Sequence, residues 1–208
     1  ELVILACNTA SAKALRSIQQ NELLQYYPNR RVLGVIRPTA ESIDSLTKTR
    51  VVGLVATDGT VQSNSYSLEV GKLFPDIEVV NQACPMWVPL IENNEHQSAG
   101  ADFFVKKYLD QLLAKNASID TLILGCTHYP LLLQKIEHYL PSSIHIVTQG
   151  NIVADSLADY LERHPELEQA CSKGGKTRFL TTESAEKFQS SASIFLQETI
   201  EAEHISLD

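Results

Sequence analysis

Two cysteines in this chain have similar sequence surroundings. Cys7 follows the apolar residues 2–6 (LVILA), and Cys126 follows residues 121–125 (TLILG). A hydroxyl or amide residue and then a helical pattern come after each cysteine. The thiolate is the reactive form of cysteine, and the free N–H groups and dipole at a helix N-terminus favour it. We therefore expect both thiols to have a lowered pKa and to exchange protons with a substrate.

Polar side chains follow both cysteines directly. Asn8, Thr9 and Thr127 supply short hydrogen-bond donors, and the N–H groups of a helix N-terminus can hold a carboxylate. Two thiols on facing strand ends suit proton exchange at one carbon from two sides. Taken singly, each cysteine is also explained as a core residue, since free cysteine is among the most buried residue types. Cys84 and Cys171 lack the shared pattern, and we interpret both as structural.

Other chemistries are less well supported. Residues 170–177 (ACSKGGKT) nearly match a phosphate-binding loop, but Ala170 replaces the first glycine. A helical pattern also precedes this segment and a strand pattern follows it, the reverse of the order that the loop needs. Cys126 and His128 have no second pair of ligands at zinc-binding spacing. No glycine-rich dinucleotide motif is found, and no lysine is singled out for pyridoxal phosphate. We expect neither a metal nor a cofactor.

Short apolar runs alternate with helical patterns along the chain. This alternation predicts an α/β fold with mostly parallel strands. In such sheets ligands bind outside the carboxyl ends of the strands, where Cys7 and Cys126 both lie. The predicted strands are residues 2–6, 31–36, 50–56, 77–81, 121–125 and 144–148, with a later one at 176–181. Residues 2–6 and 121–125 are predicted to be buried, and residues 9–20 to form the helix after Cys7.

Composition excludes several classes of function. The 208 residues are 44% hydrophobic and carry a net charge of −8, which argues against nucleic-acid binding. No apolar run approaches the roughly 18 residues of a membrane span. The four cysteines are widely spaced, so we interpret them as free thiols in a reducing cytoplasm. The expected partner is a small molecule, and a homodimer is left open.

Several segments resemble the glutamate racemases of the cofactor-independent aspartate/glutamate racemase family. Residues 6–11 (ACNTAS) resemble the family's first cysteine motif, and residues 124–131 (LGCTHYPL) resemble its second, which is very specific. Residues 34–38 (GVIRP), 56–63 (ATDGTVQS) and 84–92 (CPMWVPLIE) are similar to further family segments, in the same order. The similarity covers most of the chain and weakens after about residue 172.

The N-terminus departs from the family pattern. Members carry an Asp-Ser-Gly segment and a Pro-Tyr-Gly segment before the first cysteine, whereas this sequence begins with Glu1 and a strand pattern. In the family, the aspartate of the first segment lies beside the first cysteine, and the serine helps to hold substrate. We therefore expect native residues to be missing from the N-terminus, and residues 1–208 alone to turn over little or no substrate.

The resemblance implies two similar lobes, each a mostly parallel sheet flanked by helices, with the active site in the cleft between them. Residues 1–32 and 147–208 would form the first lobe, and residues 33–146 the second. It also implies racemisation of glutamate by two bases, which supplies D-glutamate for peptidoglycan. Cys7 would act on the D-isomer and Cys126 on the L-isomer.

The resemblance also assigns supporting residues. His128 would aid Cys126, and Glu92 would bind the substrate ammonium group or tune that side of the site. Glu92 could equally be a solvated helix end, and the two threonines of residues 56–63 could simply cap a helix. The residues expected to bind substrate are Asn8, Thr9, Thr57, Thr60, Thr127 and His128.

Two alternatives stay open at this point. One is another two-cysteine racemase, such as an aspartate racemase, although the Gly-Cys-Thr-His-Tyr-Pro-Leu string favours glutamate. The other is an inactive fragment that only binds an amino acid. A turnover assay separates an enzyme from a binding module, and substrate scope separates glutamate from aspartate.

Overall fold

The computed structural model describes residues 1–207, which form two compact units. The first unit comprises Glu1–Cys171 and contains both cysteine turns, and the second begins at Ser172. None of the described helices is long and apolar enough to cross a membrane. The division into a lobe of residues 1–32 with 147–208 and a lobe of residues 33–146 stays a prediction.

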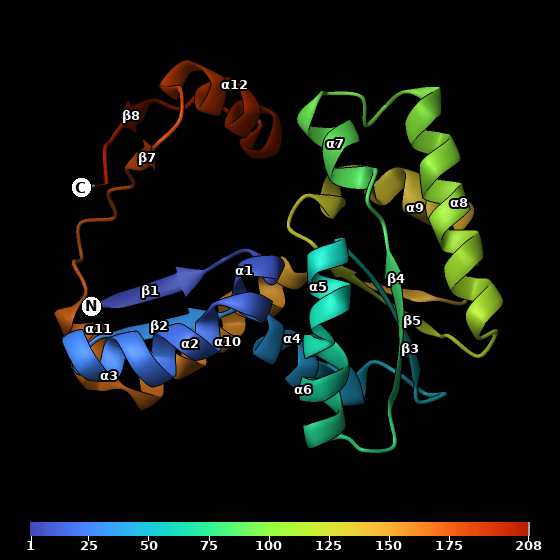
Figure 1. Ribbon diagram of the computed structural model, residues 1–208, viewed down its shortest axis with the longest axis horizontal. Helices are drawn as coiled ribbons and strands as arrows, with labels where there is room; N and C mark the ends of the chain where they lie inside the picture. Colours follow the sequence, from blue (N-terminus) through green and yellow to red (C-terminus); the bar gives the residue numbers. More distant parts are fainter. Residues whose placement is uncertain (208) are drawn as a thin grey trace. The chain divides into compact units, whose positions relative to one another are not determined.

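The larger sheet of the first unit has four parallel strands in the order β4-β3-β5-β6 (Figure 1). The central strands β3 and β5 are apolar and buried along nearly their whole length, as expected for strands covered by helices on both faces. Ala56 pairs in register with Ala83 and with Gly125, so three strands end at one edge. The four strands are β3 (Val51–Ala56), β4 (Glu78–Ala83), β5 (Thr121–Gly125) and β6 (His145–Val147).

Successive residues of β5 point into two different hydrophobic cores. Leu122 and Leu124 belong to one core and Ile123 to the other, because side chains alternate across a strand. The helices of the first core are α7 (Trp87–Glu92), α8 (Ala99–Lys115), the 3-10 helix η3 (Tyr129–Leu132) and α9 (Leu133–Tyr139). Those of the second are α4 (Ile36–Ser42), the 3-10 helix η2 (Ile43–Ser45), α5 (Asp58–Ser63) and α6 (Ser65–Leu73).

A smaller sheet carries the first cysteine. Its strands β1 (Leu2–Leu5) and β2 (Arg31–Gly34) are parallel and pair from Leu2 with Arg31 to Leu5 with Gly34. A Cβ atom on Gly34 would lie 2.7 Å from Leu15 Cδ2, so glycine allows the connecting helices to pack closely on β2. Those helices are α1 (Asn8–Lys13), α2 (Leu15–Ser17), the π-helix η1 (Ile18–Glu22) and α3 (Leu23–Tyr26). Two later helices, α10 (Gln149–Arg163) and α11 (Pro165–Ala170), complete the unit.

The structure corrects one expectation about β1. The sequence predicts a buried strand, but Val3 is 53% exposed and Ile4 is 37% exposed. Among the described residues β1 pairs with β2 alone, so it lacks the two neighbouring strands that β3 has. The apolar sequence therefore predicts the strand β1 correctly, but it does not predict how far the strand is buried.

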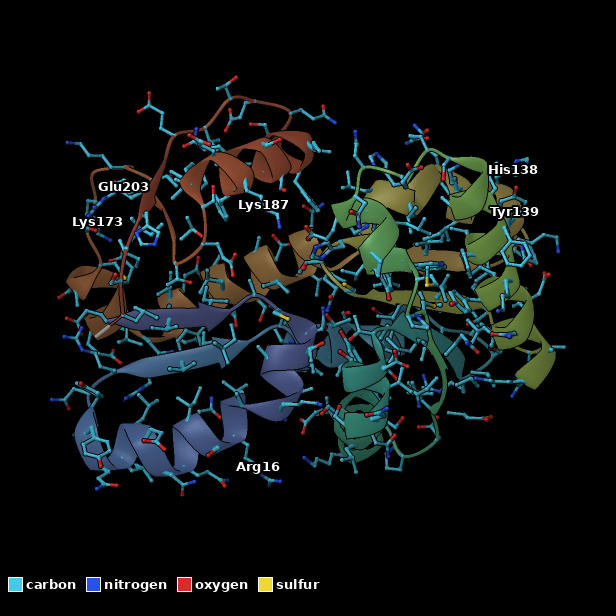
Figure 2. All side chains as sticks on the ribbon, turned by 45° about the horizontal axis from the view of Figure 1, so that its top comes forward. Arg16, His138, Tyr139, Lys173, Lys187 and Glu203 are labelled. Atoms are coloured by element: carbon cyan, nitrogen blue, oxygen red, sulfur yellow. The ribbon has the colours of Figure 1, made fainter. Side chains whose placement is uncertain are left out.

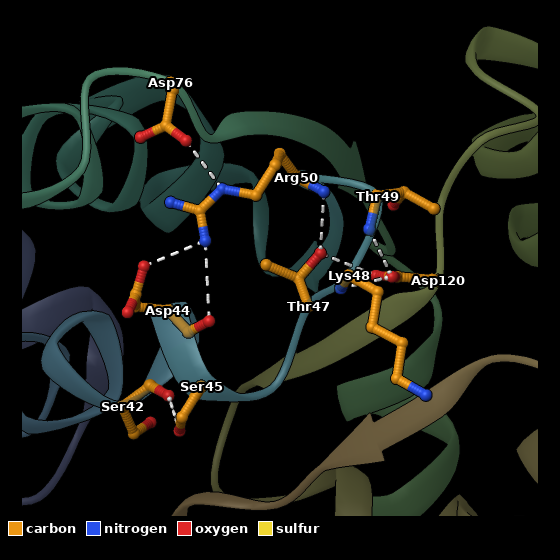
Figure 3. Close-up of polar contacts among 9 residues, drawn as sticks. All are labelled: Ser42, Asp44, Ser45, Thr47, Lys48, Thr49, Arg50, Asp76 and Asp120. Atoms are coloured by element: carbon orange, nitrogen blue, oxygen red, sulfur yellow. Dashed lines mark hydrogen bonds and ion pairs between the residues drawn. The ribbon is translucent and has the colours of Figure 1, made fainter.

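A polar cluster fixes the turn that leads into β3 (Figure 3). The Asp120 carboxylate accepts hydrogen bonds from Thr47 Oγ1 at 2.7 Å, from the Lys48 N–H at 2.6 Å and from the Thr49 N–H at 2.7 Å. Arg50 adopts a left-handed backbone conformation (φ 65°) and forms ion pairs on both sides of the turn. Asp120 directly precedes β5, so the cluster ties the starts of the two central strands together.

The second unit is a small α/β element. Its strands β7 (Phe179–Thr181) and β8 (Ala202–His204) are parallel, and α12 (Ala185–Leu196) connects them. Figure 2 labels Lys187 on α12 and Glu203 on β8, and Glu203 forms an ion pair with Arg178. Residues 172–178, which lead into β7, are all exposed and lie in neither a helix nor a strand.

Candidate functional site

Both cysteines lie where strands end, but their surroundings differ. Cys7 is exposed and has extended backbone, and its carbonyl oxygen accepts the first hydrogen bond of α1, from the N–H of Ser11. Cys126 is only 8% exposed, and its carbonyl oxygen accepts a hydrogen bond from the N–H of Tyr129. Burial is the main cause that raises the pKa of Cys126, and a charge on Cys7 would add to it, so the two thiols are close enough to interact electrostatically.

The expected lowering of the pKa is wrong for Cys126. Burial raises the pKa of its thiol to about 11, because the thiolate is poorly solvated there. The backbone N–H groups of His128 and Tyr129 oppose this shift, as expected for the start of a helix, but they do not overcome it. At neutral pH Cys126 is therefore a protonated thiol in the unliganded protein, suited to deliver a proton.

A histidine and a glutamate extend from the Cys126 thiol. His128 Nδ1 lies 3.8 Å from the sulfur, and His128 Nε2 lies 2.5 Å from a carboxylate oxygen of Glu92 at the end of α7. When Nε2–H donates to Glu92, the lone pair of Nδ1 faces the thiol and can accept its proton. The fold thus brings together the three residues expected on this side, although Glu92 and His128 are 36 positions apart.

Three threonine hydroxyls form a cluster on the Cys7 side. Thr9 Oγ1 lies 2.8 Å from Thr57 Oγ1 and 3.1 Å from Thr60 Oγ1, and the last two hydroxyls are 3.2 Å apart. Thr57 also caps α5, since its side chain accepts a hydrogen bond from the N–H of Thr60. A Cβ atom on Gly59 would lie 2.9 Å from Thr9 Cγ2, so glycine permits α1 and α5 to approach here. The capping role and the contact with Thr9 therefore coexist.

Asn8 is enclosed by residues that the sequence did not single out. It is 2% exposed, its Nδ2 donates to Gln149 Oε1 at 2.6 Å, and its Oδ1 accepts from Tyr66 Oη at 2.7 Å. These bonds use the amide oxygen and one of the two amide hydrogens. Gln149 is the first residue of α10, just after β6. Applying the strand-end rule to β6 would have identified it.

The remaining predicted residues take simple positions. Thr127 is exposed on the turn between Cys126 and His128. Cys84 is buried, and burial raises the pKa of its thiol, which fits a structural interpretation. Within residues 1–207 no three histidine, cysteine, aspartate or glutamate side chains are grouped so that they could hold a metal ion. The roles predicted for the candidate residues stay predictions.

Known proteins similar to this chain agree on one family. Residues 1–157 match the family model described as Asp/Glu/Hydantoin racemase. The glutamate racemase of Lactiplantibacillus plantarum is 34% identical over 208 residues, covering 100% of this chain and 73% of that relative. The glutamate racemase of Roseobacter denitrificans is 38% identical, covering 96% of this chain and 75% of that relative.

Solved structures give the same result. The glutamate racemase isoform RacE1 from Bacillus anthracis matches with a TM-score of 0.87 and 33% identity, covering 99% of this chain and 74% of that one. A glutamate racemase from Francisella tularensis, solved in complex with D-glutamate, matches with a TM-score of 0.82 and 31% identity, covering 100% of this chain and 73% of that one. Fold and sequence are thus shared with racemases over nearly the whole chain, and the chain belongs to the Asp/Glu/Hydantoin racemase family and is a racemase.

Proposed function

We propose that this racemase interconverts L-glutamate and D-glutamate, with Cys7 and Cys126 as the two bases. One cysteine, as thiolate, takes the α-proton from one face of the substrate, and the other, as thiol, delivers its proton to the opposite face. The configuration of the substrate is inverted. The cysteine that began as the thiolate ends as the thiol, and the cysteine that began as the thiol ends as the thiolate. The observation that carries this proposal is the pair of strand-end cysteines, close enough to interact electrostatically, one exposed and one buried as a thiol.

The environment of Cys126 fits the role of proton donor in the direction from D-glutamate to L-glutamate. Its raised pKa makes it a thiol at rest, ready to protonate the carbanion that Cys7 generates from D-glutamate. In the reverse direction Cys126 must first lose its proton, and His128, held by Glu92, is placed to accept it. Glu92 then stabilises the charged imidazole.

The remaining polar groups would hold the substrate. The hydroxyls of Thr9, Thr57, Thr60 and Thr127, with one amide hydrogen of Asn8, offer donors for the two carboxylates and for the charge that develops in the transition state. The relatives named above are glutamate racemases, and one was solved with D-glutamate, which favours glutamate as the substrate. We place the reaction in the cytoplasm, where its product D-glutamate would enter peptidoglycan synthesis.

Two cysteine variants test the proposal in the native protein. Cys7→Ala and Cys126→Ala should each abolish racemisation, because each face of the substrate needs its own base. Circular dichroism of solutions of either enantiomer measures the racemisation. Cys171→Ala is the matched control, since Cys171 follows α11 and belongs to neither cysteine turn, and it should keep full activity. Activity should also survive metal chelation and pyridoxal removal, and its loss under either treatment would contradict the two-thiol mechanism.

Serine variants test the assignment of one cysteine to each face. Cys7→Ser and Cys126→Ser each leave one working thiolate, which should still eliminate HCl from one enantiomer of 3-chloroglutamate. The two variants should prefer opposite enantiomers. A shared preference would show that both cysteines act on the same face. Assays with L- and D-aspartate in parallel measure the substrate scope.

A further inference from the structure

A closed ring of hydrogen bonds lies next to the Cys7 turn. Gln149 Nε2 donates to Tyr66 Oη at 2.6 Å, Tyr66 Oη donates to Asn8 Oδ1 at 2.7 Å, and Asn8 Nδ2 donates to Gln149 Oε1 at 2.6 Å. Each side chain gives one bond and receives one, so the directions are consistent around the ring. This consistency supports the orientation of both amide groups, since turning Gln149 alone would place two donors against each other, and turning Asn8 alone would place two acceptors against each other.

Gln149 also extends the ring to α4. Its Nε2 donates to Thr39 Oγ1 at 2.8 Å, and Thr39 Oγ1 donates to the carbonyl oxygen of Val35 at 3.1 Å. Asn8, Tyr66, Thr39 and Gln149 are all less than 9% exposed, so water does not compete for these bonds. The side chain of Gln149 therefore joins α1, α4, α6 and α10 at one buried point.

The ring constrains the backbone that carries Cys7. Asn8 is the first residue of α1, and Cys7 precedes it directly. Cys7 itself is exposed, so packing around its side chain does little to hold it. On the other side of the turn, Thr9 is held by the two threonines of α5. Asn8 and Thr9 together set the direction in which the Cys7 sulfur points.

We propose that Gln149 is a positioning residue for the Cys7 half of the reaction, acting through Tyr66 and Asn8 without touching substrate. This inference rests on the proposed two-cysteine racemisation. Without the Gln149 amide, Asn8 Nδ2 and Tyr66 Oη lose buried partners, and the start of α1 relaxes to find others. A shift of about 1 Å in a reacting group can cost about 10²-fold in rate.

The test must separate the two faces of the substrate. The equilibrium constant of racemisation is one, so kcat/KM is equal in both directions and cannot show which half is damaged. Elimination of HCl from the two enantiomers of 3-chloroglutamate can show which half is damaged, because each enantiomer is deprotonated by one cysteine. The enantiomer that Cys126→Ser still processes is the one that Cys7 deprotonates, and it serves as the Cys7 probe. The other enantiomer is the Cys126 probe.

The main variant is Gln149→Met, which keeps the side-chain length but removes both polar atoms. In the native protein it should slow elimination from the Cys7 probe by about 10²-fold and leave the Cys126 probe within a few-fold of the parent. The matched control is Gln82→Met. Gln82 lies in β4 and is equally buried at 8%. Its amide donates to the carbonyl oxygen of Ala83 and to Gln111 on α8, so this change should not alter the ratio of the two elimination rates.

Tyr66→Phe provides a second variant if Gln149→Met does not fold. It breaks the ring at one hydroxyl and keeps the aromatic packing, so it should show the same preference for damage to the Cys7 probe. Equal slowing of both probes, or no slowing of either, in a folded variant would overturn the positioning role. A parent protein that neither racemises glutamate nor eliminates from either probe would instead overturn the proposed function.

Discussion

Two similar sequence turns give two different thiols. The pattern of strand, cysteine, polar residue and helix is shared, yet Cys7 is exposed and Cys126 is buried against the core of the larger sheet. For Cys126 the loss of solvation outweighs the favourable N–H groups of His128 and Tyr129, and the pKa rises. One sequence motif placed in two environments thus gives one exposed cysteine and one buried thiol.

Alkylation rates measure this difference. Iodoacetamide reacts with the thiolate, so the rate at Cys126 should be low at neutral pH and should keep rising up to about pH 11. Peptide mass spectrometry over a pH series follows Cys7 and Cys126 in one sample. Glutamate should slow labelling of both cysteines, and Cys171 provides the internal control. A rate at Cys126 that levels off below about pH 9 would contradict the buried thiol.

Glu92 offers a test of the proton path at Cys126. Glu92→Gln removes the charge that stabilises protonated His128, so racemisation should fall toward the lower end of about 10²–10⁴-fold. Elimination from the Cys126 probe should suffer more than elimination from the Cys7 probe, the opposite of the pattern for Gln149→Met. The control is Glu95→Gln, an exposed residue on the same segment. Equal loss on both probes would point to a role in substrate binding.

At the scale of elements, the ends of the central strands determine where the site can form. β3 and β5 end together beside Cys126, and the Asp120 cluster aligns their starts at the other edge. Burial alone would raise the pKa of Asp120. The N–H of Thr49, the hydroxyl of Thr47 and the N–H of Lys48 outweigh burial, so the net pKa lies below the usual range.

Asp120→Asn should destabilise the first unit. The N–H groups of Lys48 and Thr49 share Oδ2, and the hydroxyls of Thr47 and Thr121 donate to Oδ1. Whichever way an asparagine amide turns, its NH₂ group replaces the acceptor of one of these pairs, at a cost of about 1–3 kcal/mol at neutral pH. Because the folded protein lowers the pKa of Asp120, its contribution is full above about pH 4 and is lost as the pH falls further. The difference between variant and parent in urea unfolding should therefore shrink in acid.

The control for this prediction is Asp110→Asn. Asp110 pairs with Lys106 on the exposed face of α8, and such pairs contribute about 0.3–0.5 kcal/mol. A loss of stability at Asp120 no larger than at Asp110 would show that the turn cluster does not hold the two strands.

For the whole molecule, the start of the second unit offers a stretch of exposed backbone. Residues 172–178 are exposed and lie outside helices and strands. Trypsin should cut first at Lys173 or Lys176 and release the second unit, whereas Lys106 and Lys107 inside α8 should be cut later. Mass spectrometry of a time course identifies the first cuts. Early cleavage within residues 1–171 would contradict this division of the chain.

Local sequence pattern was enough for most of the elements and for placing both cysteines at strand ends, but the short elements α7, α11 and β8 were not predicted. Residues 121–125 were predicted as a buried strand and form β5 with those bounds, because apolar residues between turn signals fix a strand by local preference. The helix after Cys7 was predicted from residues 9–20, but it starts at Asn8 and continues through a π-helix to Tyr26. The exposure of Val3 and Ile4 was missed, since covering a strand depends on distant neighbours.

The sequence by itself determined the α/β fold, the strand-end cysteines and, through resemblance, the residues expected around them. Tertiary structure alone decided that Cys126 is the buried thiol, that Glu92 reaches His128, and that Asn8 lies in a ring with Tyr66 and Gln149. The physical reason is the distance along the sequence over which each kind of interaction acts. Hydrophobic periodicity acts over a few residues, whereas Asn8 and Gln149 are 141 positions apart and meet only when the fold brings the first residues of α1 and α10 together. Desolvation, which sets the pKa of Cys126, likewise depends on what the whole fold places around the sulfur.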